Sequence, residues 1–257
     1  MRILFLSDLH FSNQDVEEVV ADKWNEIEKA VIRETEKAAI EKVVVTGDIC
    51  SHGKTKEFEA AEYYLSRLLK KMKLKEKDIF FCRGNHDADK EYAGSTFFKY
   101  TYFLHNMYQH TKRDFKETAQ RTKSGLLLMS INTCARTSLE EFDHAVLEED
   151  EVTMAVDTPK ETCNILLMHH QPGVIENQTE LMRLVQPYDL ILSGHLHGMD
   201  VSIEQIYGTT SINGLAVTPH LQEIPSGFQI LEILPGGEIQ VVCYKRKKGK
   251  KYKKQLG

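Results

Sequence analysis

Residues 79–87 read IFFCRGNHD, an apolar run that ends abruptly in polar residues. The same arrangement opens the chain, where residues 3–10 read ILFLSDLH, and it returns at residues 43–48, which read VVVTGD. Apolar runs of this length, without alternation, are typical of strands buried on both faces. We therefore expect a buried sheet in which each strand is followed by polar side chains that can bind ligands or take part in catalysis.

The segments between these runs have apolar residues at helical spacing, which predicts an α/β fold. Six apolar runs predict strands: Ile3–Leu6, Val43–Thr46, Ile79–Cys82, Leu126–Ile131, Ile165–Met168 and Leu190–Leu192. Between the first three, two sets of apolar residues recur at spacings close to a helical period: Trp24, Ile27, Val31 and Ala38, then Phe58, Ala61, Leu65, Leu68 and Met72. Alternation of strand and helix indicates a largely parallel sheet.

The pattern changes after residue 200. Val201–Tyr207, Gly227–Ile233 and Glu238–Tyr244 are strand-like, and Gly/Pro turns rather than long helices separate them. They predict a second, more antiparallel sheet packed on the first. No linker divides the 257 residues, so we expect one domain over residues 1–244 and a basic tail over residues 245–257.

Charge is distributed unevenly along the chain. Residues 245–254 read KRKKGKKYKK and carry eight basic residues, whereas the rest of the chain has 25 basic and 38 acidic residues. Such a tail can bind nucleic acid or an acidic membrane, and it can equally be a solvated terminal hairpin or a disordered end. A body near −13 would repel a long polyanion.

Cysteine usage and the N-terminus indicate a cytoplasmic protein. The five cysteines form no CxxC pair and are odd in number, which favours reduced thiols. The apolar run Ile3–Leu6 is too short for a signal-peptide core or a membrane span.

Potential metal ligands follow five of the predicted strands. These segments are Ser7-Asp8-Leu9-His10, Thr46-Gly47-Asp48, Arg83-Gly84-Asn85-His86-Asp87, His169-His170-Gln171-Pro172 and Gly194-His195-Leu196-His197. The carboxyl ends of parallel strands meet at one crevice, so distant segments can supply one site. Carboxylate and imidazole together suit Mn, Fe, Ni or Zn. Asp8 and His10, two residues apart in an extended segment, would point the same way and chelate one ion.

The motifs D-x-H (8–10), G-D (47–48), G-N-H-D (84–87), H (169) and G-H-x-H (194–197), in this order, resemble the calcineurin-like metallophosphoesterase superfamily, and particularly its class III cyclic-nucleotide phosphodiesterase branch. The resemblance implies a two-sheet αββα sandwich that binds two divalent transition-metal ions. It implies one ion on Asp8, His10, Asp48 and His197, and another on Asp48, Asn85, His169 and His195, with Asp48 bridging. It also implies that His86 assists the transition state.

The implied reaction is attack on a phosphoester by a hydroxide shared between the two ions. His86 lies outside the metal ligands and can donate a proton to the leaving oxygen. Arg83 is a candidate phosphate contact or, equally, a surface cation. Many relatives carry an acidic residue where this chain has Ser51, so either Asp87 or Asp89 would take its place beside His86, or the leaving group would need little protonation. His52 could also enter the site.

The substrate is left open among related classes. Eight aromatic residues lie between residues 91 and 123, and they could either stack a nucleobase or form the buried face of a short helix. We expect a phosphodiesterase acting on a nucleotide or a similar small diester. The alternatives are a nuclease, a phosphomonoesterase or protein phosphatase, and, least favoured, a metal-free scaffold.

Overall fold

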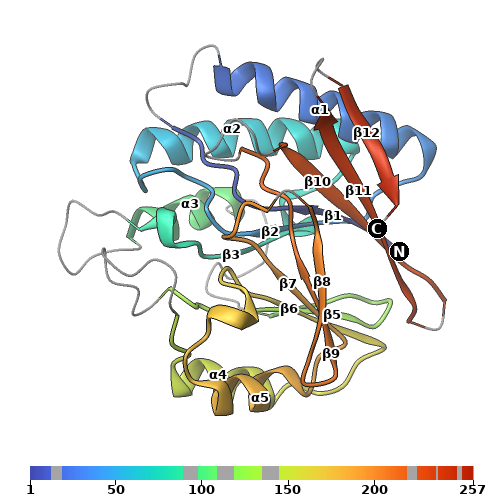
Figure 1. The fold of residues 1–257 in the computed structure, drawn as a ribbon. Coiled ribbons are helices and arrows are strands. Elements are labelled where there is room, and N and C mark those ends of the chain that lie inside the picture. Colours follow the sequence, from blue (N-terminus) through green and yellow to red (C-terminus); the bar gives the residue numbers. More distant parts are fainter. Residues whose placement is uncertain are drawn as a thin grey trace.

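The computed structural model describes residues 1–12, 19–88, 98–108, 119–134, 145–198, 200–218, 225–235, 237–247 and 251–256. Within these ranges the chain forms two six-stranded sheets that lie face to face, with helices on both outer sides (Figure 1). This is the αββα sandwich that the resemblance to the metallophosphoesterases implies.

The first sheet has the strand order β12-β11-β10-β1-β2-β3. Its strands are β1 (Arg2–Leu6), β2 (Lys42–Thr46), β3 (Ile79–Cys82), β10 (Gly227–Ile233), β11 (Ile239–Lys247) and β12 (Lys251–Leu256). β1, β2 and β3 are parallel, whereas β10, β11 and β12 add antiparallel strands beside β1. Helices α1 (Val19–Lys37), α2 (Thr55–Met72) and α3 (Phe98–Tyr108) belong to this half of the molecule.

The second sheet has the order β4-β5-β6-β7-β9-β8. Its strands are β4 (Ala119–Arg121), β5 (Leu126–Ser130), β6 (Cys163–Leu167), β7 (Leu190–Ser193), β8 (Ser202–Ile206) and β9 (Thr209–Asn213). β5, β6, β7 and β9 are parallel, and β4 and β8 are antiparallel edges. Helices α4 (Glu149–Val156) and α5 (Gln178–Val185) cover its outer face (Figure 1). Three short 3₁₀ helices are η1 (Glu76–Asp78), η2 (Asn85–Asp87) and η3 (Pro172–Val174).

Alternation along the strands divides the buried apolar residues between layers. In β1, Ile3 and Phe5 belong to the cluster between the two sheets, whereas Leu4 and Leu6 belong to the cluster beneath α1 and α2. A third cluster fills the space between the second sheet and α4 and α5. The central strands are therefore buried on both faces, as their unbroken apolar runs predict.

The helix predictions are confirmed with one exception. Phe58, Ala61, Leu65, Leu68 and Met72 are all buried on α2. The three equivalent residues of α1, from Trp24 to Val31, are also buried. Ala38 instead lies one residue beyond the end of α1 and is exposed.

The strands after residue 200 do not form a sheet of their own. β8 and β9 extend the second sheet, and β10, β11 and β12 extend the first, so the predicted separate sheet is wrong. β9 was not predicted because its sequence, TTSIN, is mostly polar. Strand pairing joins residues far apart in the chain, and local pattern does not specify the partner.

The basic C-terminal segment takes part in the last strand pair of the first sheet. β11 crosses the predicted boundary between the domain and the tail, at residues 244 and 245. β12 pairs with β11 antiparallel, with Arg246 opposite Tyr252. Lys245 forms an ion pair with Asp200, and Arg246 forms one with Glu26 at 2.8 Å. Part of the basic charge is thus neutralised by the body of the protein.

Most of the described aromatic residues between residues 91 and 123 form the buried face of a short helix, which was one of the two alternatives for this segment. Tyr100, Phe103 and Tyr108 lie on α3, are buried, and pack in the cluster beneath the helices. Tyr102 is exposed. Tyr92, Phe97 and Phe115 lie outside the described residues.

Among the described helices, none has the length and apolar composition required to cross a lipid bilayer. All five cysteines are free and buried.

Candidate metal centre

The seven predicted metal ligands meet at the carboxyl ends of the parallel strands of both sheets. Asp8 and His10 follow β1, Asp48 follows β2, Asn85 follows β3, His169 follows β6, and His195 and His197 follow β7. The ligand atoms of Asp8, His10 and His197 lie within 4.8 Å of one another, as do those of Asp48, His169 and His195. Two candidate metal-binding groups therefore lie side by side.

In the first group, His197 lies between the other two side chains. Its Nε2 is 3.2 Å from Asp8 Oδ1 and 3.0 Å from His10 Nε2. Ligands about 2.1 Å from one ion lie at most about 4.2 Å apart, so these separations fit one shared ion.

The second group adds the side-chain oxygen of Asn85. Asn85 Oδ1 lies 2.8 Å from His169 Nε2 and 3.2 Å from His195 Nδ1. His169 Nε2 is also 3.4 Å from Asp48 Oδ2. The same Asp48 oxygen lies 3.7 Å from His10 Nε2 in the first group. One carboxylate oxygen of Asp48 thus faces both groups.

The hydrogen bonds of the second group leave lone pairs that face one another unless a proton or a metal ion lies between them. His169 Nδ1 donates to the Thr46 carbonyl at 2.8 Å, so the neutral ring has its lone pair on Nε2. That lone pair faces the oxygens of Asn85 and Asp48, which also carry lone pairs. The buried Asn85 Nδ2 has no hydrogen-bond partner within the described ranges. The donor set, oxygen and imidazole nitrogen, fits a divalent transition metal.

The charges of the site also favour a cation. Burial alone would raise the pKa of Asp8, but the hydrogen bond and the charge of His197 outweigh burial and lower the pKa to about 2. Burial lowers the pKa of His169, but the carboxylate of Asp48 outweighs this effect and raises the pKa to about 9. Without a metal the carboxylates therefore hold a proton on His169, where a divalent ion would compete with it.

The backbone of the metal-binding segments is strained. Asp8, His10, Asp48, His195 and His197 have φ angles between 45° and 74°. They are five of the seven non-glycine residues with positive φ in the described ranges. Such a conformation costs about 1–3 kcal/mol per residue and concentrates at functional sites. The prediction that Asp8 and His10 lie in an extended segment is therefore wrong, because left-handed turns bring these side chains together.

Two glycines permit the close approach of these segments. A Cβ on Gly84 would lie 2.0 Å from the backbone nitrogen of Asp48, and a Cβ on Gly194 would lie 2.1 Å from Ser7 Oγ. Neither position needs a positive φ. Glycine is therefore needed at both because no space is available for a side chain.

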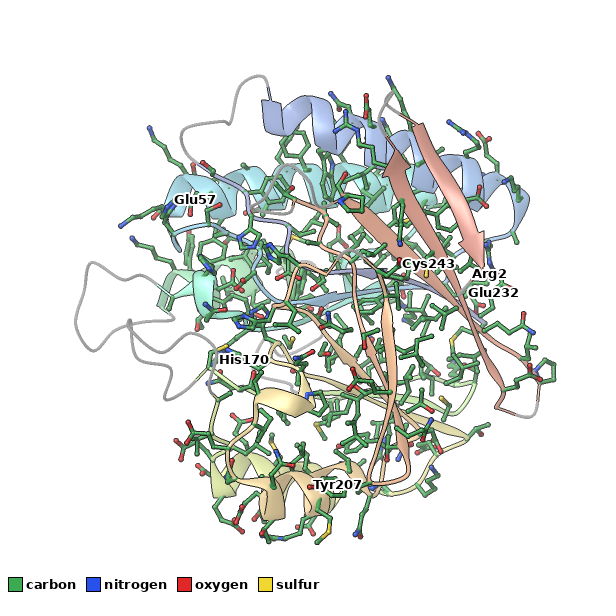
Figure 2. All side chains as sticks on the ribbon, in the orientation of Figure 1. Arg2, Glu57, His170, Tyr207, Glu232 and Cys243 are labelled. Carbon is green, nitrogen blue, oxygen red and sulfur yellow. The ribbon has the colours of Figure 1, made fainter. Side chains whose placement is uncertain are left out.

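Several residues that hold the ligands had no role in the sequence analysis. Ser7 Oγ donates to Asp8 Oδ2, and Thr46 Oγ1 donates to Ser7 Oγ. His170 is buried beside the centre, with its ring centroid 4.5 Å from that of His195, and its Nδ1 is 2.9 Å from Thr133 Oγ1 (Figure 2). Their position in the sequence could have identified them, because Ser7, Thr46 and His170 each lie within two residues of a proposed ligand.

His86 lies beside the first group and is oriented by a backbone carbonyl. Its Nδ1 donates to the Ser51 carbonyl at 2.9 Å, its backbone N–H donates to Asp48 Oδ1 at 2.8 Å, and its ring centroid is 5.0 Å from that of His10. Asp87 does not orient it, since its carboxylate accepts from the backbone N–H groups of Cys50 and Gly84. Asp89 lies outside the described residues.

Two other candidates lie outside both groups. The guanidinium of Arg83 is 5.7 Å from the centre of the Tyr100 ring. His52 is exposed, and its Nδ1 lies 3.1 Å from the buried carboxylate of Glu57 at the start of α2 (Figure 2). His52 is therefore not part of either metal-binding group.

Comparison with known proteins gives a consistent family and fold. A model of the calcineurin-like phosphoesterase family matches residues 1–199, whereas a search of curated proteins finds no match. The fold is similar to that of the Thermus thermophilus protein TT1561, with a TM-score of 0.59, 15% identity, and coverage of 93% of this chain and 97% of that one.

Two longer proteins share the fold as well. Purple acid phosphatase PPD1 from yellow lupin has a TM-score of 0.58 and 15% identity over 96% of this chain and 51% of its own. The sulfate thiohydrolase SoxB of Thermus thermophilus has a TM-score of 0.54 and 13% identity over 93% of this chain and 55% of its own. This chain spans about half the length of each, and identities this low show the fold alone. The family match and the two donor groups together show that the chain belongs to the calcineurin-like phosphoesterases, a family of hydrolases that use two divalent metal ions.

Proposed function

We propose that this chain is a dinuclear-metal-dependent phosphodiesterase acting on a nucleotide or a similar small diester. The observation that carries the proposal is the position of Asp48 Oδ2, which faces both metal-binding groups. Two divalent ions held there would lower the pKa of a water molecule and polarise the phosphoryl oxygens for in-line displacement.

Each side chain has a proposed role. Asp8, His10, Asp48 and His197 hold one ion, and Asp48, Asn85, His169 and His195 hold the other. Carbonyl and hydroxyl groups of Thr46 and Ser7 fix the orientation of these ligands, which preserves the geometry while substrate binds and leaves.

We assign His86 to the leaving oxygen. Because Nδ1 donates to a carbonyl, the neutral ring has an acceptor at Nε2, and only the imidazolium form can donate a proton there. With a carbonyl rather than a carboxylate at Nδ1, we expect the best substrates to be esters whose leaving oxygen needs little protonation.

We favour diesters over monoesters because of their charge. A monoester dianion carries one more negative charge than a diester, so its binding gains more from cations beyond the two metal ions. Arg83 is the single such cation that we propose for the site. Arg83 is the candidate contact for the phosphate, although its guanidinium lies over Tyr100. Manganese is the proposed activating metal, and five free cysteines are compatible with a proposed cytoplasmic location.

The test is hydrolysis, with added Mn²⁺ or with EDTA, of a chromogenic diester, the matching monoester, cyclic nucleotides and single-stranded DNA. We expect metal-dependent turnover with the highest kcat/KM on a small diester. Asp48→Asn should abolish turnover and lower the bound metal below one ion per chain, because one loss weakens both groups. Exposed Asp157 is the matched control, and Asp157→Asn should leave both measurements unchanged.

The outcomes separate the alternatives. Fastest turnover of the monoester would replace the diesterase assignment with a phosphatase, and fastest cleavage of DNA would replace it with a nuclease. Near-normal activity in Asp48→Asn would remove the bridging role of Asp48. No bound metal and no turnover would leave a scaffold.

A further inference from the structure

A groove with a volume of about 400 Å³ lies between α2 and α3. It is lined by residues one and two helical turns apart on each helix: Thr55, Phe58, Glu59 and Glu62 on α2, and Lys99, Tyr102, Phe103 and Asn106 on α3. A volume of this size matches the lower range of sites that bind small molecules.

The two helices that line the groove begin near the edge of the sheet that carries the metal-binding groups. α2 follows Asp48 along the chain, and its buried Glu57 accepts the backbone N–H of His52, the residue after the Ser51 carbonyl that orients His86. At the start of α3, Tyr100 lies beneath the guanidinium of Arg83, which follows β3. Both helices therefore start beside the centre.

The two helices run in the same direction away from that edge. Phe58 lies against Phe103 with ring centroids 5.3 Å apart, and further along Asn106 Nδ2 donates to Glu62 Oε2 at 3.3 Å. At 1.5 Å per residue, Lys99 and Asn106 are about 10 Å apart along the helix axis. The groove thus follows both helices over a length that suits one ring system.

Its lining has an apolar base and polar ends. Phe58 and Phe103 are buried, while the ring of Tyr102 is 58% exposed and offers an aromatic face. Lys99 lies on the first turn of α3, at the end of the groove nearer the metal-binding groups. Glu62 lies at the far end, where its carboxylate can accept hydrogen bonds.

We propose that this groove binds a planar aromatic group attached to the substrate phosphate, with its ring against Tyr102 and an amino substituent near Glu62. The proposal rests on the proposed function, since the phosphate must lie at the metal centre. Stacking on an exposed tyrosine gives sequence-tolerant affinity for aromatic rings, and the carboxylate selects rings that bear hydrogen-bond donors.

The test measures binding of phosphonates, whose P–C bond replaces the scissile ester. Calorimetry on the Mn²⁺-loaded full chain would compare propylphosphonate, 3-phenylpropylphosphonate and its 3-aminophenyl derivative. We expect the phenyl ligand to bind about tenfold more tightly than the propyl ligand, and the amino derivative to bind more tightly again.

Variants assign the preference to the groove. Tyr102→Ala should make the phenyl and propyl dissociation constants equal, whereas Tyr102→Phe should preserve their ratio. Tyr63 on α2 is exposed to 61% but does not line the groove, so Tyr63→Ala is the matched control and should behave as wild type. Glu62→Gln should remove only the gain from the amino group. Thermal melting of each variant checks folding.

Equal dissociation constants for phenyl and propyl ligands in the wild type, no binding of the phenyl ligand, or an unchanged ratio in Tyr102→Ala would overturn the groove. The same preparation is assayed on a chromogenic diester. If that diester is turned over but the phenyl ligand binds no more tightly than the propyl ligand, the proposed role of the groove is wrong and the proposed function stands. Absence of metal-dependent turnover contradicts the proposed function.

Discussion

At the scale of the residue, the most informative side chain is His86. The family resemblance implies an acidic partner for this histidine, and the structure instead supplies the Ser51 carbonyl. The carbonyl accepts from Nδ1 and leaves Nε2 as the ring nitrogen that can face the leaving oxygen. We propose that His86 donates a proton from this nitrogen.

The proposed role of His86 as proton donor predicts how activity depends on the leaving group. His86→Gln keeps a side chain that can donate a hydrogen bond but removes the titratable proton. We expect a small loss of kcat/KM with 4-nitrophenoxide as leaving group and a loss of roughly 10²-fold or more with an alkoxide, consistent with general acid catalysis. The measurement is kcat/KM over a series of diesters with leaving groups of increasing basicity.

His52 is the control because its ring contacts Glu57 rather than the metal-binding groups. His52→Gln should shift all the esters equally or not at all. Equal losses on every ester in His86→Gln would show that the ring positions substrate without donating a proton.

At the scale of the element, the turns after the strands decide the geometry of the centre. Five of the proposed ligands have a positive φ, a conformation that persists only where the surrounding structure enforces it. Gly84 is the closest contact, with its hypothetical Cβ 2.0 Å from Asp48 N and 2.2 Å from Asp48 Oδ1. The loops after β2 and β3 are thus packed through a position that admits no side chain.

Gly84→Ala should therefore damage both stability and metal binding. The added methyl meets backbone that cannot move cheaply, so we expect a loss of at least about 2 kcal/mol in the free energy of unfolding. We also expect bound metal to fall, since Asp48 must shift. Denaturant unfolding and elemental analysis give the two measurements.

Gly173 provides a matched glycine, because its hypothetical Cβ meets only Gln171 Nε2, at 3.9 Å. Gly173→Ala should change neither quantity appreciably. If Gly84→Ala also bound two ions with unchanged stability, the close approach of the two loops would not be a requirement of the centre.

At the scale of the molecule, the two sheets contribute different ligands to one centre. The first sheet supplies Asp8, His10, Asp48 and Asn85, and the second supplies His169, His195 and His197. Each candidate group therefore contains residues from both sheets. The apolar layer between the sheets holds these two sets in register.

The C-terminal strand pair extends the first sheet and carries basic residues. We expect removal of residues 248–257, which contain five lysines, to leave diester hydrolysis and binding of single-stranded DNA unchanged. Lys245 and Arg246 remain paired with acidic side chains of the body, and β11 keeps its pairing with β10. Truncation before residue 245 would be less informative, because it cuts into β11.

The measurement is DNA affinity at several salt concentrations for the full and shortened chains. A nucleic-acid arm would predict lost affinity and a shallower salt dependence, by about 0.7 per phosphate contact removed on a single strand. That result would restore the nuclease alternative.

Much of the architecture and the donor set follows from local sequence. Unbroken apolar runs specify β1, β2, β3, β5, β6 and β7, because a strand buried on both faces has no polar positions. The seven proposed ligands could be identified because a polar residue directly after such a run lies at the carboxyl edge of the sheet. Their chemistry alone indicates a transition metal.

Other features depend on contacts between distant segments. The partners of β9 and β10, the left-handed turns at Asp8 and His10, and the Ser51 carbonyl beneath His86 are set by packing across the chain. Apolar periodicity and residue type act over a few neighbours, so the sequence by itself determined the elements and the candidate ligands. Strand pairing, backbone strain and hydrogen-bond partners arise only when the two sheets meet, so the tertiary structure decided how those ligands are held.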